Sequence, residues 1–138
     1  MSDCVGIDQA RTASTDSLHF ATGKLGQAPV FWGRYFKTPG HSSPIQYQAT
    51  LETKFFNNNN IKVLPVGRQT ANVNKPNRAL GRQDGLDNAA AMIASFGANH
   101  LSAMTQVAVF LDAEIDNPLN HVYTKDGARD WLQAAGVM

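Results

Sequence analysis

Short, mostly apolar runs alternate along the chain with longer stretches in which apolar residues recur at helical spacing. The apolar runs lie at residues 4–7, 30–33, 61–67 and 107–111. Runs of this length that are rich in β-branched and aromatic residues are typical of strands buried on both faces of a parallel sheet. The last run, Val107 to Leu111, shows this most clearly because five apolar residues follow one another without a polar interruption.

The stretches between these runs have the features of helices. The expected ranges are about 15–25, 45–56, 84–96 and 126–135. Ser14 or Thr15 can cap the first helix and Gly26 can end it, while Gly97 can end the alanine-rich third helix. A strand followed by a helix therefore occurs about four times, which predicts parallel βα units with right-handed crossovers. We expect an α/β fold in a single domain over residues 1–138.

Polar and charged residues follow each predicted strand. They are Asp8, Arg34 with Tyr35, Arg68 with Gln69, and Asp112 with Glu114. Ligands of parallel α/β folds bind at the carboxyl ends of the strands, so these residues are expected to converge on one rim. Asp112, Glu114 and Asp116 stand at every second position and would share one face of an extended strand. Carboxylates crowded in this way repel one another, which favours a chemical role over packing.

Each candidate also has a structural interpretation. The acids are equally suited to cap loops or to pair with Arg34 and Arg68, and Asp116, which precedes Asn117 and Pro118, is typical of a turn. Arg34 and Tyr35 can hold a sugar or an anion through hydrogen bonds and ring stacking. The alternative is that Arg34 neutralises the acids while Tyr35 packs. Arg68 and Gln69 are further candidates for substrate binding.

Composition and charge exclude several classes of protein. The 138 residues carry a formal net charge of +1 and no basic run, which argues against a nucleic-acid binder. No apolar stretch approaches the roughly 20 residues of a membrane helix, and no secretory signal is recognised at the N-terminus. The chain is expected to be cytoplasmic or exported without a cleaved signal. A single cysteine and four histidines without ligand spacing predict no disulfide, metal or cofactor.

Four short motifs together resemble a known family. They are Gly6-Ile7-Asp8, Gly33-Arg34-Tyr35, Leu64-Pro65-Val66 and Asp112-Ala113-Glu114. They are similar to the first half of a glycoside hydrolase family 25 barrel, and still more to the glycoside-hydrolase-like domains related to it. The resemblance implies a TIM (β/α)8 architecture in which the acid of the first strand and the Asp-x-Glu pair of the fourth line the cleft. Glu114 would then be the catalytic acid, with Asp112 or Asp8 as its partner.

The resemblance covers most of the chain but only about four βα units, whereas a complete barrel needs on the order of 200 residues or more. The chain is therefore expected to form a partial or half barrel. A lysozyme-like hydrolase acting on cell-wall polysaccharide of the peptidoglycan type is the expected function. The alternatives are an inactive carbohydrate-binding or assembly module, and an open α/β domain that binds a small anion through Arg34 and Arg68. Because open sheet edges invite pairing, a homo-oligomer that completes the sheet is also expected.

Overall fold

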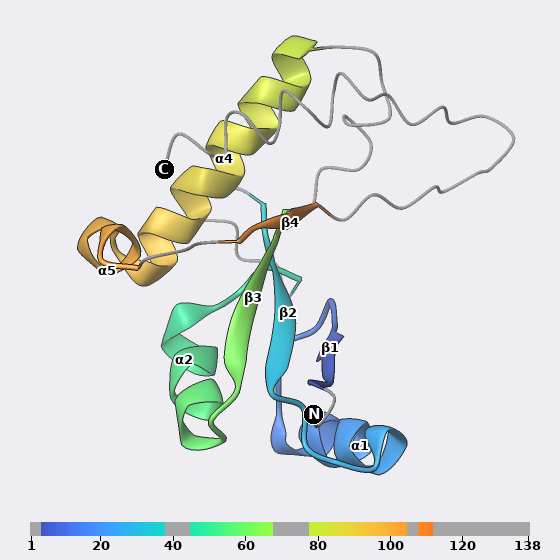
Figure 1. Ribbon diagram of the computed structural model, residues 1–138. Helices are drawn as coiled ribbons and strands as arrows, with labels where there is room; N and C mark the ends of the chain where they lie inside the picture. Colours follow the sequence, from blue (N-terminus) through green and yellow to red (C-terminus); the bar gives the residue numbers. More distant parts are fainter. Residues whose placement is uncertain (1–3, 38–44, 68–77, 105–107, 112–138) are drawn as a thin grey trace, which may run out of the picture.

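The computed structural model describes residues 4–37, 45–67, 78–104 and 108–111, and in this part of the chain helices connect the strands of a parallel sheet (Figure 1). The elements are β1 (Gly6–Asp8), α1 (Thr15–Leu25), β2 (Phe31–Phe36), α2 (Ala49–Asn58), β3 (Lys62–Gly67), α4 (Arg78–Phe96), α5 (Ala98–Ser102) and β4 (Phe110–Leu111). The predicted α/β class is confirmed. The helix expected near residues 126–135 lies outside the described residues.

The order of the strands in the sheet is the order of the strands in the chain, β1-β2-β3-β4, and every pair is parallel. Asp8 pairs with Gly33, and Gly33 pairs in turn with Leu64. β4 pairs with the carboxyl end of β3, where Val66 lies opposite Phe110. The carboxyl ends of the four described strands therefore lie along one edge of the sheet.

The predicted ends of α1 are confirmed. The Ser14 hydroxyl accepts a hydrogen bond from the Ser17 main-chain N–H at 3.2 Å, and the Ser17 hydroxyl accepts one from Ser14 N–H at 2.9 Å. This reciprocal arrangement satisfies two N–H groups that a helix start otherwise leaves without partners. Gly26 ends the helix with a φ of 73°, a conformation in which a residue without Cβ avoids steric strain.

Helix α2 begins four residues later than the expected start at Ile45. Residues Gln46 and Tyr47 are held against β2 instead, because Gln46 forms a parallel bridge with Tyr35 and the Tyr47 N–H donates to the Tyr35 carbonyl at 2.8 Å. A long-range pairing has overridden local helical spacing here. The helix ends at Asn58, two residues beyond the expected end and inside the run of four asparagines at 57–60, and Asn60 at the end of that run adopts a left-handed φ of 54°.

Strand β2 is longer than predicted and continues through Arg34 to Phe36. It pairs with β3 along its whole length, so residues expected in a loop belong to the middle of the sheet. Helix α4 starts at Arg78 instead of Asp84, because the residues before Asp84 include good helix formers such as Leu80 and Gln83. The short α5 was not predicted.

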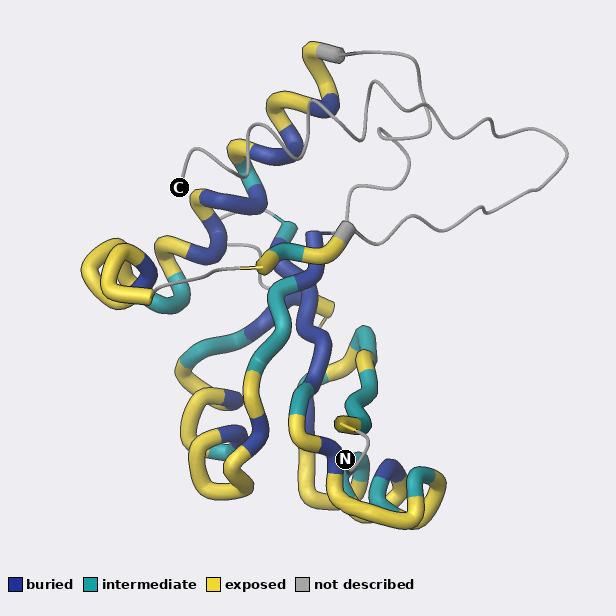
Figure 2. The backbone as a smooth tube through the Cα atoms, viewed as in Figure 1, coloured by how far each residue is buried: buried dark blue, intermediate teal, exposed yellow. Residues whose placement is uncertain are grey.

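The helices pack on one face of the sheet. Trp32 and Phe36 lie four residues apart on β2, so both side chains point to this face. There they pack in one cluster with Phe56 of α2 and Met92 of α4. All four side chains are at most 1% exposed. Figure 2 shows β2 as the most continuously buried strand, which fits its position between two neighbours and under the helices.

Candidate functional site

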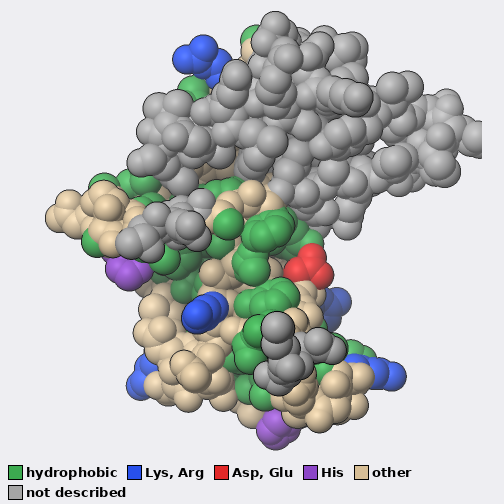
Figure 3. All heavy atoms as spheres, viewed as in Figure 1, with side chains coloured by type: hydrophobic (Ala, Val, Ile, Leu, Met, Phe, Trp, Pro, Cys, Tyr) green, Lys and Arg blue, Asp and Glu red, His purple; other side chains and the backbone are tan. Residues whose placement is uncertain are grey.

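The other face of the sheet carries an open hollow of about 480 Å³. Among the described residues, its lining comes from the strands: Gly6, Ile7, Asp8, Phe31, Gly33, Leu64, Val66 and Phe110. Hydrophobic side chains gather over the strands beside an acidic group in Figure 3. The described helices belong to the opposite face, so among the described residues this face has no covering layer. The hollow includes Asp8 at the end of β1, and ligands of parallel α/β folds bind at the carboxyl ends of the strands, which makes it the leading candidate for a binding site in the described part of the chain.

Asp8 is the carboxylate of this hollow. It ends β1 and is exposed, and its Oδ2 accepts a hydrogen bond from the Tyr35 hydroxyl at 3.0 Å. Tyr35 itself is only 4% exposed, so a buried tyrosine fixes the position of the exposed Asp8 carboxylate. Gly33, between them on the same face, provides the room that this arrangement needs. The sequence motif Gly-Arg-Tyr thus serves in part to orient the acid of the neighbouring strand.

Replacing Gly33 with alanine should displace the Asp8 side chain. A Cβ at this position would lie 2.7 Å from the Cβ of Asp8 and 3.3 Å from Val66 Cγ2. The distance of 2.7 Å is shorter than two carbon atoms tolerate, so Asp8 has to move. We expect a loss of stability of about 1–3 kcal/mol, the usual cost of overpacking. Chemical denaturation measures it.

Gly23→Ala is the matched control for this substitution. A Cβ at Gly23 meets nothing within 4 Å and the residue lies inside α1, so this variant should be more stable by about 0.5–1 kcal/mol. Equal responses of the two variants would show that the close approach of Asp8 to Gly33 has no energetic consequence.

The structure separates Arg34 from Tyr35, which the sequence analysis grouped as candidate substrate-binding residues. Neighbouring residues of a strand point to opposite faces, so Tyr35 reaches Asp8 while Arg34 points to the helix-covered face. The Arg34 side chain is 0% exposed. This burial favours the structural alternative for Arg34, and its role in binding a ligand stays a prediction.

Glu52 of α2, which the sequence analysis did not single out, is the partner of Arg34. Arg34 Nε donates to Glu52 Oε1 at 2.6 Å and Nη2 donates to Oε2 at 3.0 Å, and both side chains are 0% exposed. This is a two-point, charge-assisted pair of the strongest kind. A signal was available: an arginine inside an apolar strand needs an acid, and Glu52 is the only acid between residues 45 and 56.

Tyr47 lies beside this pair. Burial raises its pKa above the ordinary value of 10.0, the Glu52 carboxylate adds to the rise, and the hydrogen bond with Thr53 opposes it. Because the folded state holds this proton more tightly than the unfolded chain, Tyr47 contributes stability that is present below pH 10 and is lost as the pH rises through the folded pKa.

The remaining candidates lie outside the described residues: Arg68, Gln69, Asp112 and Glu114. Their places in the sequence are nonetheless informative, because Arg68 directly follows the last residue of β3 and Asp112 directly follows the last residue of β4. Their roles stay predictions.

No protein-family model matches the chain, and no curated protein matches it. In the described part of the chain, no three His, Cys, Asp or Glu side chains lie close enough to hold a metal ion together. The helices of that part are all too short or too polar to cross a membrane.

Proposed function

We propose that the chain is a glycoside-hydrolase-like domain that binds a polysaccharide of the peptidoglycan or chitin type at the carboxyl ends of its strands, beside the hollow on the face opposite the described helices, and hydrolyses it with Glu114 and Asp112. The observation that supports this most is the exposed Asp8 carboxylate at the carboxyl end of β1, anchored by the Tyr35 hydroxyl beside an open hollow. The apolar lining suits the apolar face of a sugar ring, and the carboxylate suits its hydroxyl groups.

The topology supports a half (β/α)8 barrel as the finer description of the fold. Doubly wound sheets reverse their strand order and carry helices on both faces. Here the strand order follows the chain and the described helices pack on one face only. In a (β/α)8 barrel, the helix-free face of the sheet is the interior, and the ligand site lies at the carboxyl ends of the strands.

Strand spacing supports different proposed roles for the acids. Three strand spacings separate β1 from β4, so Asp8 lies roughly 14 Å from that strand in a flat sheet, and less in a curved one. The two carboxyl groups of a glycosidase are about 5–9.5 Å apart. The sequence predicts that the strand continues through Asp112 and Glu114; residues two apart on an extended strand are about 6.6 Å apart, which would suit these two acids as the reacting pair. Asp8 is better placed to hold hydroxyl groups of the sugar.

A binding module without activity is the second candidate, and it needs only Asp8 and the hollow. The third expectation, an anion site built on Arg34 and Arg68, has less support because the guanidinium of Arg34 is buried against Glu52.

Titration calorimetry with the N-acetylglucosamine tetramer tests the proposal. Asp8→Asn should weaken binding roughly tenfold or more, since hydrogen bonds to a charged acceptor are the stronger ones. Asp16→Asn, at an exposed acid of α1, is the matched control and should leave the affinity unchanged. If the parent protein takes up no sugar at millimolar concentration, or if both variants bind as the parent does, the carbohydrate proposal fails.

A second copy of the chain is proposed as the partner that completes the sheet. Among the described strands, β1 and β4 form the two edges and each pairs on one side only. Two copies related by a twofold axis would supply eight strands, with antiparallel junctions between the copies. Light scattering on a gel-filtration peak should therefore give the mass of a dimer. A clean monomer at high micromolar concentration would leave a self-sufficient open sheet.

A further inference from the structure

We propose that the buried Arg34–Glu52 pair is a positioning device that locks the loop after β1 to the loop after β2, and so fixes the orientation of Asp8. The contacts themselves stand on the structure alone. The importance of the Asp8 orientation for a ligand rests on the function proposed above.

The Arg34 guanidinium holds three main-chain carbonyls in addition to Glu52. Nη1 donates to the carbonyls of Gln9 at 2.8 Å and Ile45 at 3.1 Å, and Nη2 donates to that of Gln46 at 3.3 Å. With the two bonds to Glu52, all five N–H donors of the side chain have acceptors. Gln9 belongs to the loop after β1, and Ile45 and Gln46 belong to the segment before α2.

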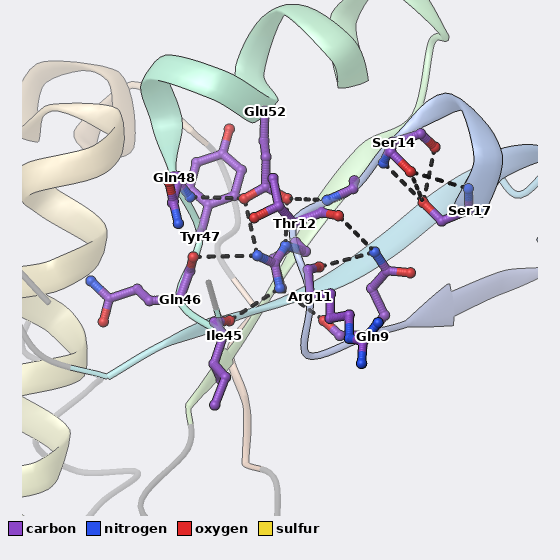
Figure 4. Close-up of polar contacts among 12 residues, drawn as sticks. Gln9, Arg11, Thr12, Ser14, Ser17, Ile45, Gln46, Tyr47, Gln48 and Glu52 are labelled. Carbon is purple, nitrogen blue, oxygen red and sulfur yellow. Dashed lines mark hydrogen bonds and ion pairs between the residues drawn. The ribbon is translucent and has the colours of Figure 1, made fainter. Parts of the chain in front are cut away.

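Glu52 also binds main-chain groups of both loops. Its Oε1 accepts the main-chain N–H of Ala13 at 2.9 Å, and its Oε2 accepts that of Gln48 at 2.8 Å. Figure 4 shows Glu52 between the two loops, with Gln9 on one side and Gln46 and Gln48 on the other. The hydrogen bonds of Arg34 to Gln9, Gln46 and Glu52 place its guanidinium among these residues. Five main-chain groups from the two loops are thus bound to one ion pair.

Such an arrangement is poorly explained by stability alone. The free-energy cost of removing two charges from water offsets most of the gain from their attraction. Apolar side chains of similar volume therefore often give an equally stable core. An ion pair that also binds main-chain groups of two loops gives a defined geometry, which an apolar pair cannot do. The best-supported use of buried charges is this kind of structural specificity.

Three consecutive residues of β2 act together on the end of β1. Gly33 makes room for the Asp8 side chain and its carbonyl faces the Gln9 N–H at 3.5 Å. Arg34 holds the Gln9 carbonyl from the helix-covered face, and Tyr35 holds the Asp8 carboxylate from the hollow face. Gln9 is therefore held through both its N–H and its carbonyl, and the neighbouring Asp8 is held through its side chain. A change at Glu52 should be transmitted to Gln9, and so to Asp8, through Arg34.

The test compares Glu52→Gln with Phe56→Leu by NMR on the full chain without ligand. Glu52→Gln keeps the shape of the side chain but loses the charge, so the amide hydrogens of Ala13 and Gln48 should exchange roughly tenfold faster or more. The carboxyl carbon resonance of Asp8 should move toward its position in Tyr35→Phe. Phe56→Leu, in the core at 1% exposure, lowers overall stability. The Phe56 ring stacks on Tyr47 with centroids 6.3 Å apart, but its replacement removes none of the hydrogen bonds described for Asp8, Ala13 or Gln48, so it should change neither readout selectively.

Glu52→Asp, which keeps the charge and shortens the side chain, takes the place of Glu52→Gln if the latter does not fold, with the same expected changes. If the Glu52 variants lose stability as Phe56→Leu does, while the Asp8 resonance and the two amide hydrogens keep their parent values, the pair has no positioning role. These readouts involve no sugar, so their failure is separate from a failure of carbohydrate binding. Weaker binding of the N-acetylglucosamine tetramer by Glu52→Gln, but not by Phe56→Leu, would connect the positioning of Asp8 with carbohydrate binding.

Discussion

Replacing Arg34 with leucine should destabilise the fold by about 3–5 kcal/mol, the usual loss when one partner of a buried ion pair is removed. The variant leaves the Glu52 carboxylate at 0% exposure without its cation, and it leaves three main-chain carbonyls without a donor. Since domains are stable by only about 5–15 kcal/mol, this loss removes a large part of the stability, and the variant should unfold at a much lower urea concentration than the parent. Urea denaturation followed by tryptophan fluorescence measures the loss, because Trp32 lies in the core.

Lys54→Leu is the control for this substitution. Lys54 is an exposed residue of the same helix as Glu52, so its replacement should change the free energy of unfolding by no more than about 0.5 kcal/mol. A loss below about 1 kcal/mol for Arg34→Leu would mean that the buried pair stabilises the fold no more than an exposed one does.

The elements could be predicted where local physics decides them. The Ser14 cap and the Gly26 terminus of α1 are local signals, and both are where the sequence indicated. The parallel order of the strands also followed from the alternation of strand and helix. The start of α2 could not be predicted in this way, because residues before it are bound by a strand distant in the sequence, through the contact of Gln46 with Tyr35.

The candidate site was predicted only in part, for reasons that are visible in two residues. Asp8 was identified from its place after an apolar run, and the structure leaves it exposed at the carboxyl end of β1. Arg34 was assigned to the same rim because the strand was thought to end at Gly33. Once β2 extends to Phe36, alternation along the strand sends Arg34 and Tyr35 to opposite faces. The error in the predicted end of β2 therefore led to the grouping of Arg34 with Tyr35 as ligand-binding residues.

Replacing Glu114 with glutamine should abolish hydrolysis of peptidoglycan or chitin-type oligomers, with a loss of turnover of about 10²–10⁴-fold, the usual contribution of a general acid. The amide cannot donate a proton to the leaving oxygen but has nearly the shape of the acid, so the fold should be unchanged. Release of reducing ends from a soluble oligomer measures the turnover. Asp116→Asn, at the acid assigned to a turn, should behave like the parent protein.

Unchanged turnover in Glu114→Gln would remove Glu114 from the role of acid. A parent protein that binds the oligomer without cleaving it would favour the binding module, in which Asp8 and the hollow are sufficient.

The most direct test of the central claim asks which face of the sheet the sugar contacts. Leu64 and Val66 line the hollow, while Ile61 and Met92 belong to the core on the helix-covered face. Titration with the N-acetylglucosamine tetramer, followed through the methyl resonances of these residues, should shift Leu64 and Val66 and leave Ile61 and Met92 in place. Shifts confined to Ile61 and Met92, or no shifts at millimolar sugar, would contradict a polysaccharide site beside the hollow.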